Sequence, residues 1–159
     1  KTESEALGVM LSDLLTQEKI HFTDEELDWK SAITLAAQPL LRQGEIEESY
    51  ISAIINRVDE FGPYIDLGMG IALPHARPED GVNKLGMSLL KCDKPVYLQD
   101  DPKHEIKIFI VLAAIDNETH LKALSTLTQI LSNKEELNKM LTAETVAELE
   151  QIFSEKEGE

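Results

Sequence analysis

The run IKIFIVLAAI, residues 106–115, narrows the possible folds of this chain more than any other segment. Beyond Lys107 every side chain in the run is apolar, so both faces of an extended strand would be apolar. Such a strand is typical of the centre of a sheet that helices cover on both sides, where neither face meets water. We therefore expect an α/β fold built around this strand.

The rest of the chain has the hydrophobic periodicity of helices at its two ends and of strands in its middle. The expected helices span residues 6–15, 28–43, 47–61, 118–131, 134–141 and 143–153, and the expected strands span residues 64–67, 71–73, 85–90 and 106–114. Asp28 is expected to cap the second helix, and Gly44 to end it. This order predicts a single mixed, mostly parallel β-sheet flanked by helices on both faces, in one domain over residues 1–159 with its core at about 7–153.

Composition narrows the class of protein. An apolar content of 42% is enough for one core, and the single cysteine, Cys92, excludes an internal disulfide framework and favours a reducing compartment. No apolar run reaches the roughly 18 residues of a membrane span, and the N-terminal segment lacks a signal-peptide core, so we expect a cytoplasmic protein without direct membrane insertion. The net charge of −15 repels nucleic acid and would steer a basic protein partner, although on charge alone a role in solubility is the simpler interpretation.

The stretch GIALPHARPEDG, residues 70–81, places a histidine at the end of an expected strand. Pro74 has a fixed φ and no backbone donor, and it favours an extended residue before it, so His75 is held at the tip of that strand. Ligand crevices open at strand ends in α/β sheets, and Arg77 is near enough to share an anionic ligand. From these residues alone, a surface loop with an incidental histidine is the simpler interpretation.

A second histidine, His120, follows the strand that ends near Ala114. We expect Asn117 to cap the next helix, which places His120 in its first turn, where the helix dipole attracts anions. The alternative is a satisfied, partly buried core histidine. Two histidines at strand ends, one beside an arginine and one at a helix N-terminus, together suit a phosphoryl group.

Other chemistries fit the sequence less well. The chain has no HExxH motif, no cysteine–histidine cluster, no Walker A motif and no GxGxxG run, so we expect neither a metal nor a nucleotide cofactor. The other two histidines, His21 and His104, lie in polar segments and are assigned no role. A metal-dependent hydrolase that uses His75 and His120 stays open as an alternative.

The chain resembles the enzyme IIA components of the bacterial phosphoenolpyruvate:sugar phosphotransferase system, in the mannitol–fructose superfamily. The resemblance rests on FGPY, GIALPHARPEDGV, KPV and VLAAIDNETH followed by LKALSTLTQIL, and it extends from about residue 7 to 153. It implies that His75 accepts a phosphoryl group on Nε2 from the phosphocarrier HPr and passes it to a cysteine of the cognate enzyme IIB. It also implies that His120 helps to hold the phosphoryl group, that no cofactor takes part, and that a membrane enzyme IIC performs the transport.

Two points stay open within the resemblance. Mannitol-type members carry a functional arginine on the helix before the histidine strand, where Arg57 lies, but the FGPY segment changes its spacing to His75, so Arg77 is the preferred cation. The FGPY segment resembles the ascorbate-type subgroup, which makes L-ascorbate one candidate substrate. A regulatory domain of the same fold, excised from or acting on a transcriptional regulator, is the alternative to a transport component.

Overall fold

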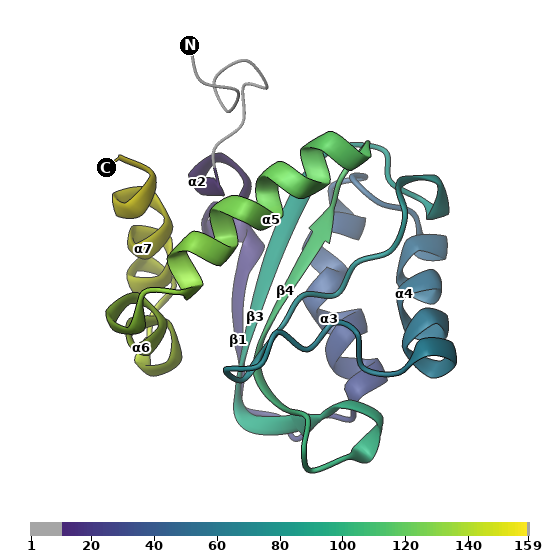
Figure 1. Ribbon diagram of the computed structural model, residues 1–159, viewed down its shortest axis with the longest axis horizontal. Helices are drawn as coiled ribbons and strands as arrows, with labels where there is room; N and C mark the ends of the chain where they lie inside the picture. The colour runs from purple at the N-terminus through teal and green to yellow at the C-terminus, as the bar shows by residue number, and fades with distance from the viewer. Residues whose placement is uncertain (1–10, 159) are drawn as a thin grey trace.

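A computed structural model describes residues 11–158 and shows a β-sheet between two groups of helices (Figure 1). The helices are α2 (Leu11–Leu14), α3 (Trp29–Arg42), α4 (Glu48–Phe61), α5 (Asn117–Leu131), α6 (Lys134–Thr142) and α7 (Val146–Gly158). The strands are β1 (Ile20–Thr23), β2 (Ile71–Ala72), β3 (Gly86–Tyr97) and β4 (Glu105–Ala113). Short 3₁₀ turns cover Gln17–Lys19, Pro78–Asp80 and Leu98–Asp100.

The four strands lie in the order β1-β3-β4-β2. Strands β1 and β3 pair in parallel, as do β2 and β4, whereas β3 and β4 are antiparallel. Two of the three pairings are therefore parallel, which confirms the expected mixed, mostly parallel sheet. Because β2 and β4 run in the same direction, the residues that follow them emerge at the same edge of the sheet.

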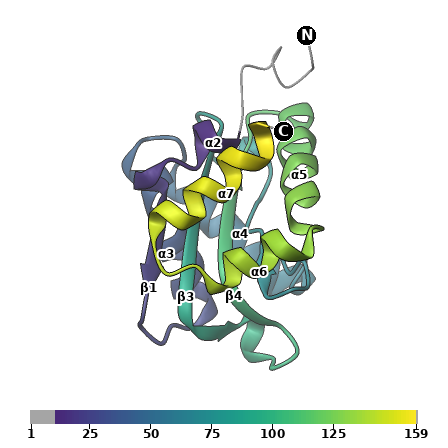
Figure 2. The ribbon, with the colours of Figure 1, turned by 90° about the vertical axis from the view of Figure 1, so that its left-hand side faces the viewer.

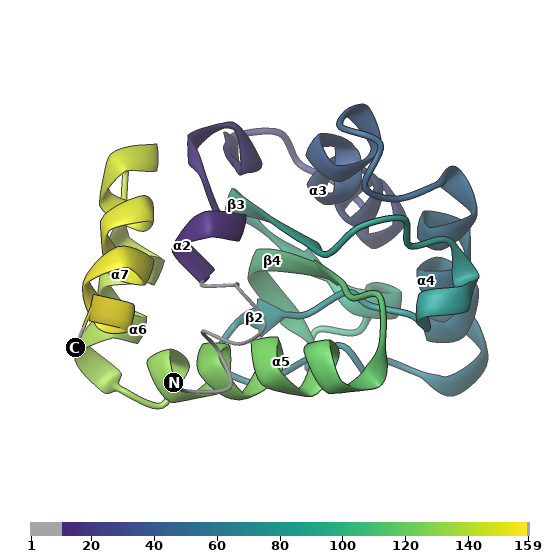
Figure 3. The same ribbon diagram turned by 90° about the horizontal axis from the view of Figure 1, so that it is seen from above.

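Helices cover both faces of the sheet, as the central strand predicts (Figures 2 and 3). Helices α3 and α4 lie on one face, and α2, α5, α6 and α7 lie on the other. Alternate residues of β4 belong to two hydrophobic clusters: Phe109 and Val111 pack with α3 and α4, and Ile108 and Ile110 pack with the other group. The strand is thus buried from both sides, which is why its sequence lacks an alternation of apolar and polar residues.

Local signals place the helix ends well, with one correction. Asp28 caps α3, and its carboxylate accepts a hydrogen bond from Ser31 N at 2.8 Å. Helix α5 is capped by Asp116 and not by Asn117, because the Asp116 carboxylate accepts hydrogen bonds from both the amide and the hydroxyl of Thr119, each at 2.7 Å. The start of the helix therefore moves by one residue, and His120 becomes its fourth residue.

The sheet differs from the expectation at three places. Residues 64–67 form a turn that folds back beside β2 without a ladder, since Leu73 N donates to Ile65 O at 2.7 Å and Leu67 N donates to Ile71 O at 2.9 Å. The edge strand β1 was not predicted. Strand β3 continues to Tyr97, beyond the expected end at Leu90, because β4 pairs with it up to that point.

Helices α3 to α6 begin and end within one residue of the predicted bounds, whereas α7 differs from its predicted bounds by several residues at each end. Helix α7 begins at Val146 instead of Ala143. Only the last part of the first expected helix, α2, falls in the described region, and residues 6–10 lie outside it. None of the helices within residues 11–158 combines the length and the apolar character needed to cross a membrane.

Candidate active site

His75 lies at the end of β2, where several hydrogen bonds hold the main chain. Leu73 N donates to Ile65 O at 2.7 Å, and Leu112 N donates to Pro74 O at 3.1 Å, so the chain keeps its place beside β4 after the strand ends. The Pro74 carbonyl thus accepts a hydrogen bond from β4, although proline has no N–H to donate to the sheet. The His75 side chain is half-buried.

The hydrogen bond of the His75 ring identifies its neutral tautomer. Nδ1 lies 2.7 Å from the main-chain oxygen of Leu73. A carbonyl oxygen only accepts hydrogen bonds, so Nδ1 is the nitrogen that carries the proton. The lone pair of neutral His75 is then on Nε2, which is the nitrogen available for attack on an electrophile.

His120 lies next to His75, as the two strand ends predicted. The centroids of the two imidazole rings are 5.0 Å apart, and the rings are tilted by 51°. The parallel pairing of β2 and β4 brings them together, because one follows β2 and the other lies in the first turn after β4. Neither ring nitrogen of His120 makes a hydrogen bond to another residue in the described part of the chain, so both can contact a ligand.

Burial keeps both histidines uncharged at neutral pH. The pKa of His75 is lowered from 6.5 chiefly because the ring is removed from water. The hydrogen bond to Leu73 opposes this shift, whereas His120, when it is protonated, and the positive charge of Arg57 add to it. Burial also lowers the pKa of His120 from the same ordinary value. A neutral imidazole is the form that can act as a nucleophile.

Two tyrosines hold the main chain around His75, and neither contact was predicted from the sequence. The ring of Tyr64 stands edge-on to the imidazole of His75, with a centroid distance of 5.2 Å, and its hydroxyl donates to the His75 main-chain oxygen. The hydroxyl of Tyr50, on α4, accepts from Ala76 N at 3.0 Å. The helical spacing of Tyr50, Ile54 and Val58 marks Tyr50 as a core residue, but nothing in the sequence indicates its hydrogen-bond partners.

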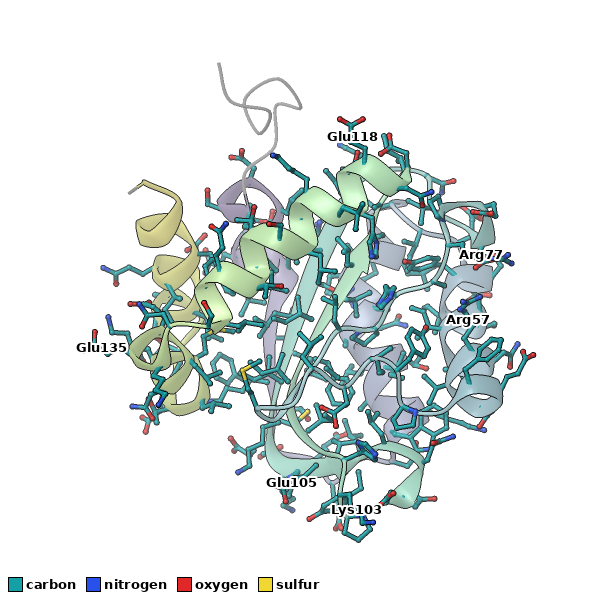
Figure 4. The ribbon with its side chains drawn as sticks, in the orientation of Figure 1. Arg57, Arg77, Lys103, Glu105, Glu118 and Glu135 are labelled. Carbon is teal, nitrogen blue, oxygen red and sulfur yellow. The ribbon has the colours of Figure 1, made fainter. Side chains whose placement is uncertain are left out.

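The two arginines lie on the same side of the molecule but in different surroundings (Figure 4). Arg57 stacks on the rings of Phe61 and Tyr64, with its guanidinium carbon 5.4 Å and 6.0 Å from their centroids. No carboxylate of residues 11–158 forms an ion pair with Arg57. The positive charge of Arg57 contributes to lowering the pKa of His75. Arg77 is exposed and forms an ion pair with Asp80 at 3.4 Å. The hydrogen bond to the Asp80 carboxylate raises the pKa of Arg77.

The site has few metal ligands. A protein metal site normally needs three or more ligating side chains. Among the described residues, no group of three or more histidine, cysteine, aspartate or glutamate side chains is arranged to hold a metal ion. His104, to which no role was assigned, instead forms a hydrogen bond from its Nδ1 to the Asp66 carboxylate at 2.7 Å, and His21 is exposed on β1.

Comparison with known proteins identifies the family. The family model described as phosphoenolpyruvate-dependent sugar phosphotransferase system, EIIA 2, matches residues 13–156. The mannitol-specific cryptic phosphotransferase enzyme IIA component of Escherichia coli K12 is 38% identical over 146 residues, which cover 91% of this chain and 97% of that protein. The solution structure of the Escherichia coli mannitol-specific cryptic enzyme IIA matches with a TM-score of 0.84 and 37% identity, covering 92% of this chain and 99% of that one.

A second relative bears a different substrate name. The ascorbate-specific EIIA component of Escherichia coli K12 is 31% identical over 141 residues, which cover 87% of this chain and 92% of that protein. The mannitol-named relative therefore shares more identical residues with this chain than the ascorbate-named one does. Identity alone does not favour the ascorbate-type subgroup that the FGPY segment resembles.

Proposed function

The chain belongs to the EIIA type 2 family of the phosphoenolpyruvate-dependent sugar phosphotransferase system, and we propose that His75 is the residue on which it carries the phosphoryl group. Members of this family are phosphotransferases of sugar transport. In this proposal the donor is phospho-HPr and the acceptor is a cysteine of the cognate enzyme IIB. The membrane component, enzyme IIC, then moves a sugar or sugar-like substrate, and the chain itself works in the cytoplasm.

The observation that carries this proposal is the hydrogen bond between His75 Nδ1 and the Leu73 carbonyl. The Nε2 lone pair forms the new N–P bond while the P–N bond to the donor histidine breaks, and the donor ring leaves with the electron pair. The proton stays on Nδ1, so the phosphorylated ring of His75 carries a positive charge. When the enzyme IIB thiolate attacks phosphorus, His75 leaves as a neutral imidazole, which is a good leaving group.

The neighbours of His75 fit the needs of such a transfer, which depends on in-line positioning and on stabilisation of charge. His120 has one ring N–H that can donate to a phosphoryl oxygen, and it lies at the positive end of α5. Arg57 supplies a positive charge that is not tied to a carboxylate of the described residues, so we infer that Arg57 binds the phosphoryl group in preference to Arg77.

The acidic charge of the chain fits a basic partner. A net charge of −15 speeds the encounter with a carrier that presents a basic face, as the family resemblance implies for HPr. The same site must also serve enzyme IIB, so each complex has to be transient, with a modest interface.

The direct test is phosphorylation by phosphoenolpyruvate, enzyme I and HPr, followed by intact mass and by the acid stability of the product. We expect one acid-labile phosphate on the wild-type chain and none on His75→Gln. His21→Gln is the matched control, because His21 is exposed on β1 and takes no part in the site. An unphosphorylated wild type, or phosphate that persists in His75→Gln, would rule out the assignment.

The same phosphorylation assay distinguishes the contributions of Arg57 and Arg77 to phosphoryl transfer. We expect Arg57→Gln to slow transfer to His75 by about 10²-fold, the effect of removing one charge-stabilising donor from a reaction site. Arg77→Gln should change the rate far less, since that side chain is exposed and paired with Asp80. The opposite order would assign the phosphoryl-binding role to Arg77.

The substrate is tested through the partners. Mannitol and L-ascorbate are the candidate substrates, because two relatives are named for them. Purified phosphorylated protein should pass its phosphate to a mannitol-type or an ascorbate-type enzyme IIB at clearly different rates. Transfer to neither, with phosphorylation of His75 intact, would favour the regulatory alternative.

A further inference from the structure

Tyr50 is fully buried on α4, with 0% of its surface exposed, and it is among the largest side chains of the core. Its hydroxyl lies 2.6 Å from the main-chain oxygen of Leu112, near the end of β4, and 3.0 Å from the amide of Ala76, directly after His75. These contacts join parts of the chain that are 62 and 26 residues away from Tyr50. One hydroxyl therefore links three segments of the fold.

The directions of these hydrogen bonds follow from the groups involved. A phenol has one proton and accepts through its oxygen lone pairs. The Ala76 amide can only donate, so Tyr50 accepts from it, and the Tyr50 proton goes to the nearer carbonyl, that of Leu112. The Ala76 carbonyl, at 3.3 Å, is the weaker acceptor.

Leu112 is linked by hydrogen bonds to the main chain on both sides of His75. Its amide donates directly to Pro74 O at 3.1 Å, and its carbonyl is connected to Ala76 N through the Tyr50 hydroxyl. Residues 74 and 76 are thus both held to one residue of β4. The same strand leads through Asp116 into α5, which carries His120.

We propose that the Tyr50 hydroxyl is a positioning group that fixes His75 relative to His120. The proposal rests on the phosphoryl-transfer role of these histidines and adds a residue that touches neither ring. Without the hydroxyl, the Pro74 side of His75 stays attached to β4 while the Ala76 side loses its link. Tyr64 still holds the His75 carbonyl, but His75 is then tied to β4 on its Pro74 side alone, so its ring can turn away from His120.

Two further facts suit Tyr50 to this role. Burial raises the pKa of its hydroxyl to about 12, so the group keeps its proton at every pH at which the protein works. In-line transfer is also sensitive to position, since a misplacement of about 1 Å costs roughly a hundredfold in rate.

The experiment compares Tyr50→Phe with Ser88→Ala. Ser88 is also fully buried on the α3 face of the sheet, and its hydroxyl donates to Ala36 O at 2.6 Å, so each variant loses one buried hydroxyl. Among residues 11–158, the Ser88 hydroxyl makes no hydrogen bond to the segments that carry His75 and His120. The phosphorylation rate by phospho-HPr is measured for each, with ¹⁵N spectra that report the tautomer of His75 and proton contacts between the two imidazole rings.

We expect Tyr50→Phe to transfer about 10-fold to 100-fold more slowly than wild type and to lose the ring contact between His75 and His120. Ser88→Ala should keep both the rate and the contact. Placing 4-aminophenylalanine at position 50 restores a donor toward Leu112 but gives a poorer acceptor for Ala76, so it should recover part of the rate. This variant also tests the proposal if Tyr50→Phe fails to fold.

Folded Tyr50→Phe with the wild-type rate would overturn the proposal, and so would an equal slowing in Ser88→Ala. If 4-aminophenylalanine is the variant compared, a rate equal to wild type would likewise overturn it. Failure of the phosphoryl-transfer role itself gives a different result, because the wild-type chain would then not be phosphorylated at all. The ring contact in the spectra does not depend on that activity.

Discussion

A methyl group added at Gly81 would test how closely the loop after His75 packs against α4. Gly81 has a φ of +138°, and its carbonyl accepts a hydrogen bond from Glu47 N at 2.8 Å. A Cβ atom at this position would lie 2.6 Å from Ser49 Oγ and 3.0 Å from Tyr50 N. The Tyr50 amide belongs to the helix backbone and cannot move aside, so the loop itself must shift.

The magnitude follows from two contributions. Positive φ in a residue with a side chain costs about 1–3 kcal/mol of unfolding free energy. Steric overlap in a packed region adds about 1–3 kcal/mol. Gly44 supplies the matched control, since its φ is +71° but no atom lies within 4 Å of an added Cβ.

We expect Gly81→Ala to be less stable than Gly44→Ala by the overlap contribution, about 1–3 kcal/mol in urea unfolding. For a domain of this size, each kcal/mol lowers the melting temperature by about 2–4 °C. Equal unfolding free energies for the two variants would refute the reasoning, because they would show that the loop does not press on α4. A slower transfer to His75 in Gly81→Ala than in Gly44→Ala would further show that the displacement reaches the histidine.

Three other predictions follow from burial and charge. Lys19→Met should cost about 3–5 kcal/mol of unfolding free energy, because it leaves the carboxylate of Glu45 buried without its partner. Lys30→Met, which breaks an exposed pair, should cost less than about 1 kcal/mol in the same urea titration. Burial raises the pKa of the Cys92 thiol to about 12, so iodoacetamide at pH 8 should alkylate it only in unfolded protein, as mass spectrometry can show. Because burial lowers the pKa of His75 below 6.5, its phosphorylation rate should stay constant above that pH and fall only under more acidic conditions, where Nε2 becomes protonated; a fall that begins above pH 6.5 would contradict the direction of the shift.

The helices and the central strand could be predicted because their signals are local. Asp28 caps α3 by accepting a hydrogen bond from the amide of Ser31, three residues further along the chain. The apolar run in β4 predicts burial on both faces of the strand from its own residues alone. The proximity of His75 and His120 was also predictable, since both follow strands of one sheet. The phosphoryl-transfer roles of these residues stay predictions.

Features that depend on distant partners could not be predicted. The strand β1 has only four residues, and its sequence IHFT becomes a strand through pairing with β3. Residues 64–67 have the apolar character of a strand but satisfy their backbone in a turn beside β2. The roles of Tyr50 and Tyr64 likewise come from hydrogen bonds across 26 and 11 residues, which no local pattern contains.

The two edges of the sheet have a consequence for self-association. Its outer strands, β1 and β2, have four and two residues, whereas the inner strands β3 and β4 have twelve and nine. The unpaired amides and carbonyls of an edge strand are a template on which another chain can add a strand, and short edges offer few of them. The short edges thereby protect this protein against sheet-to-sheet aggregation and strand exchange with its own copies.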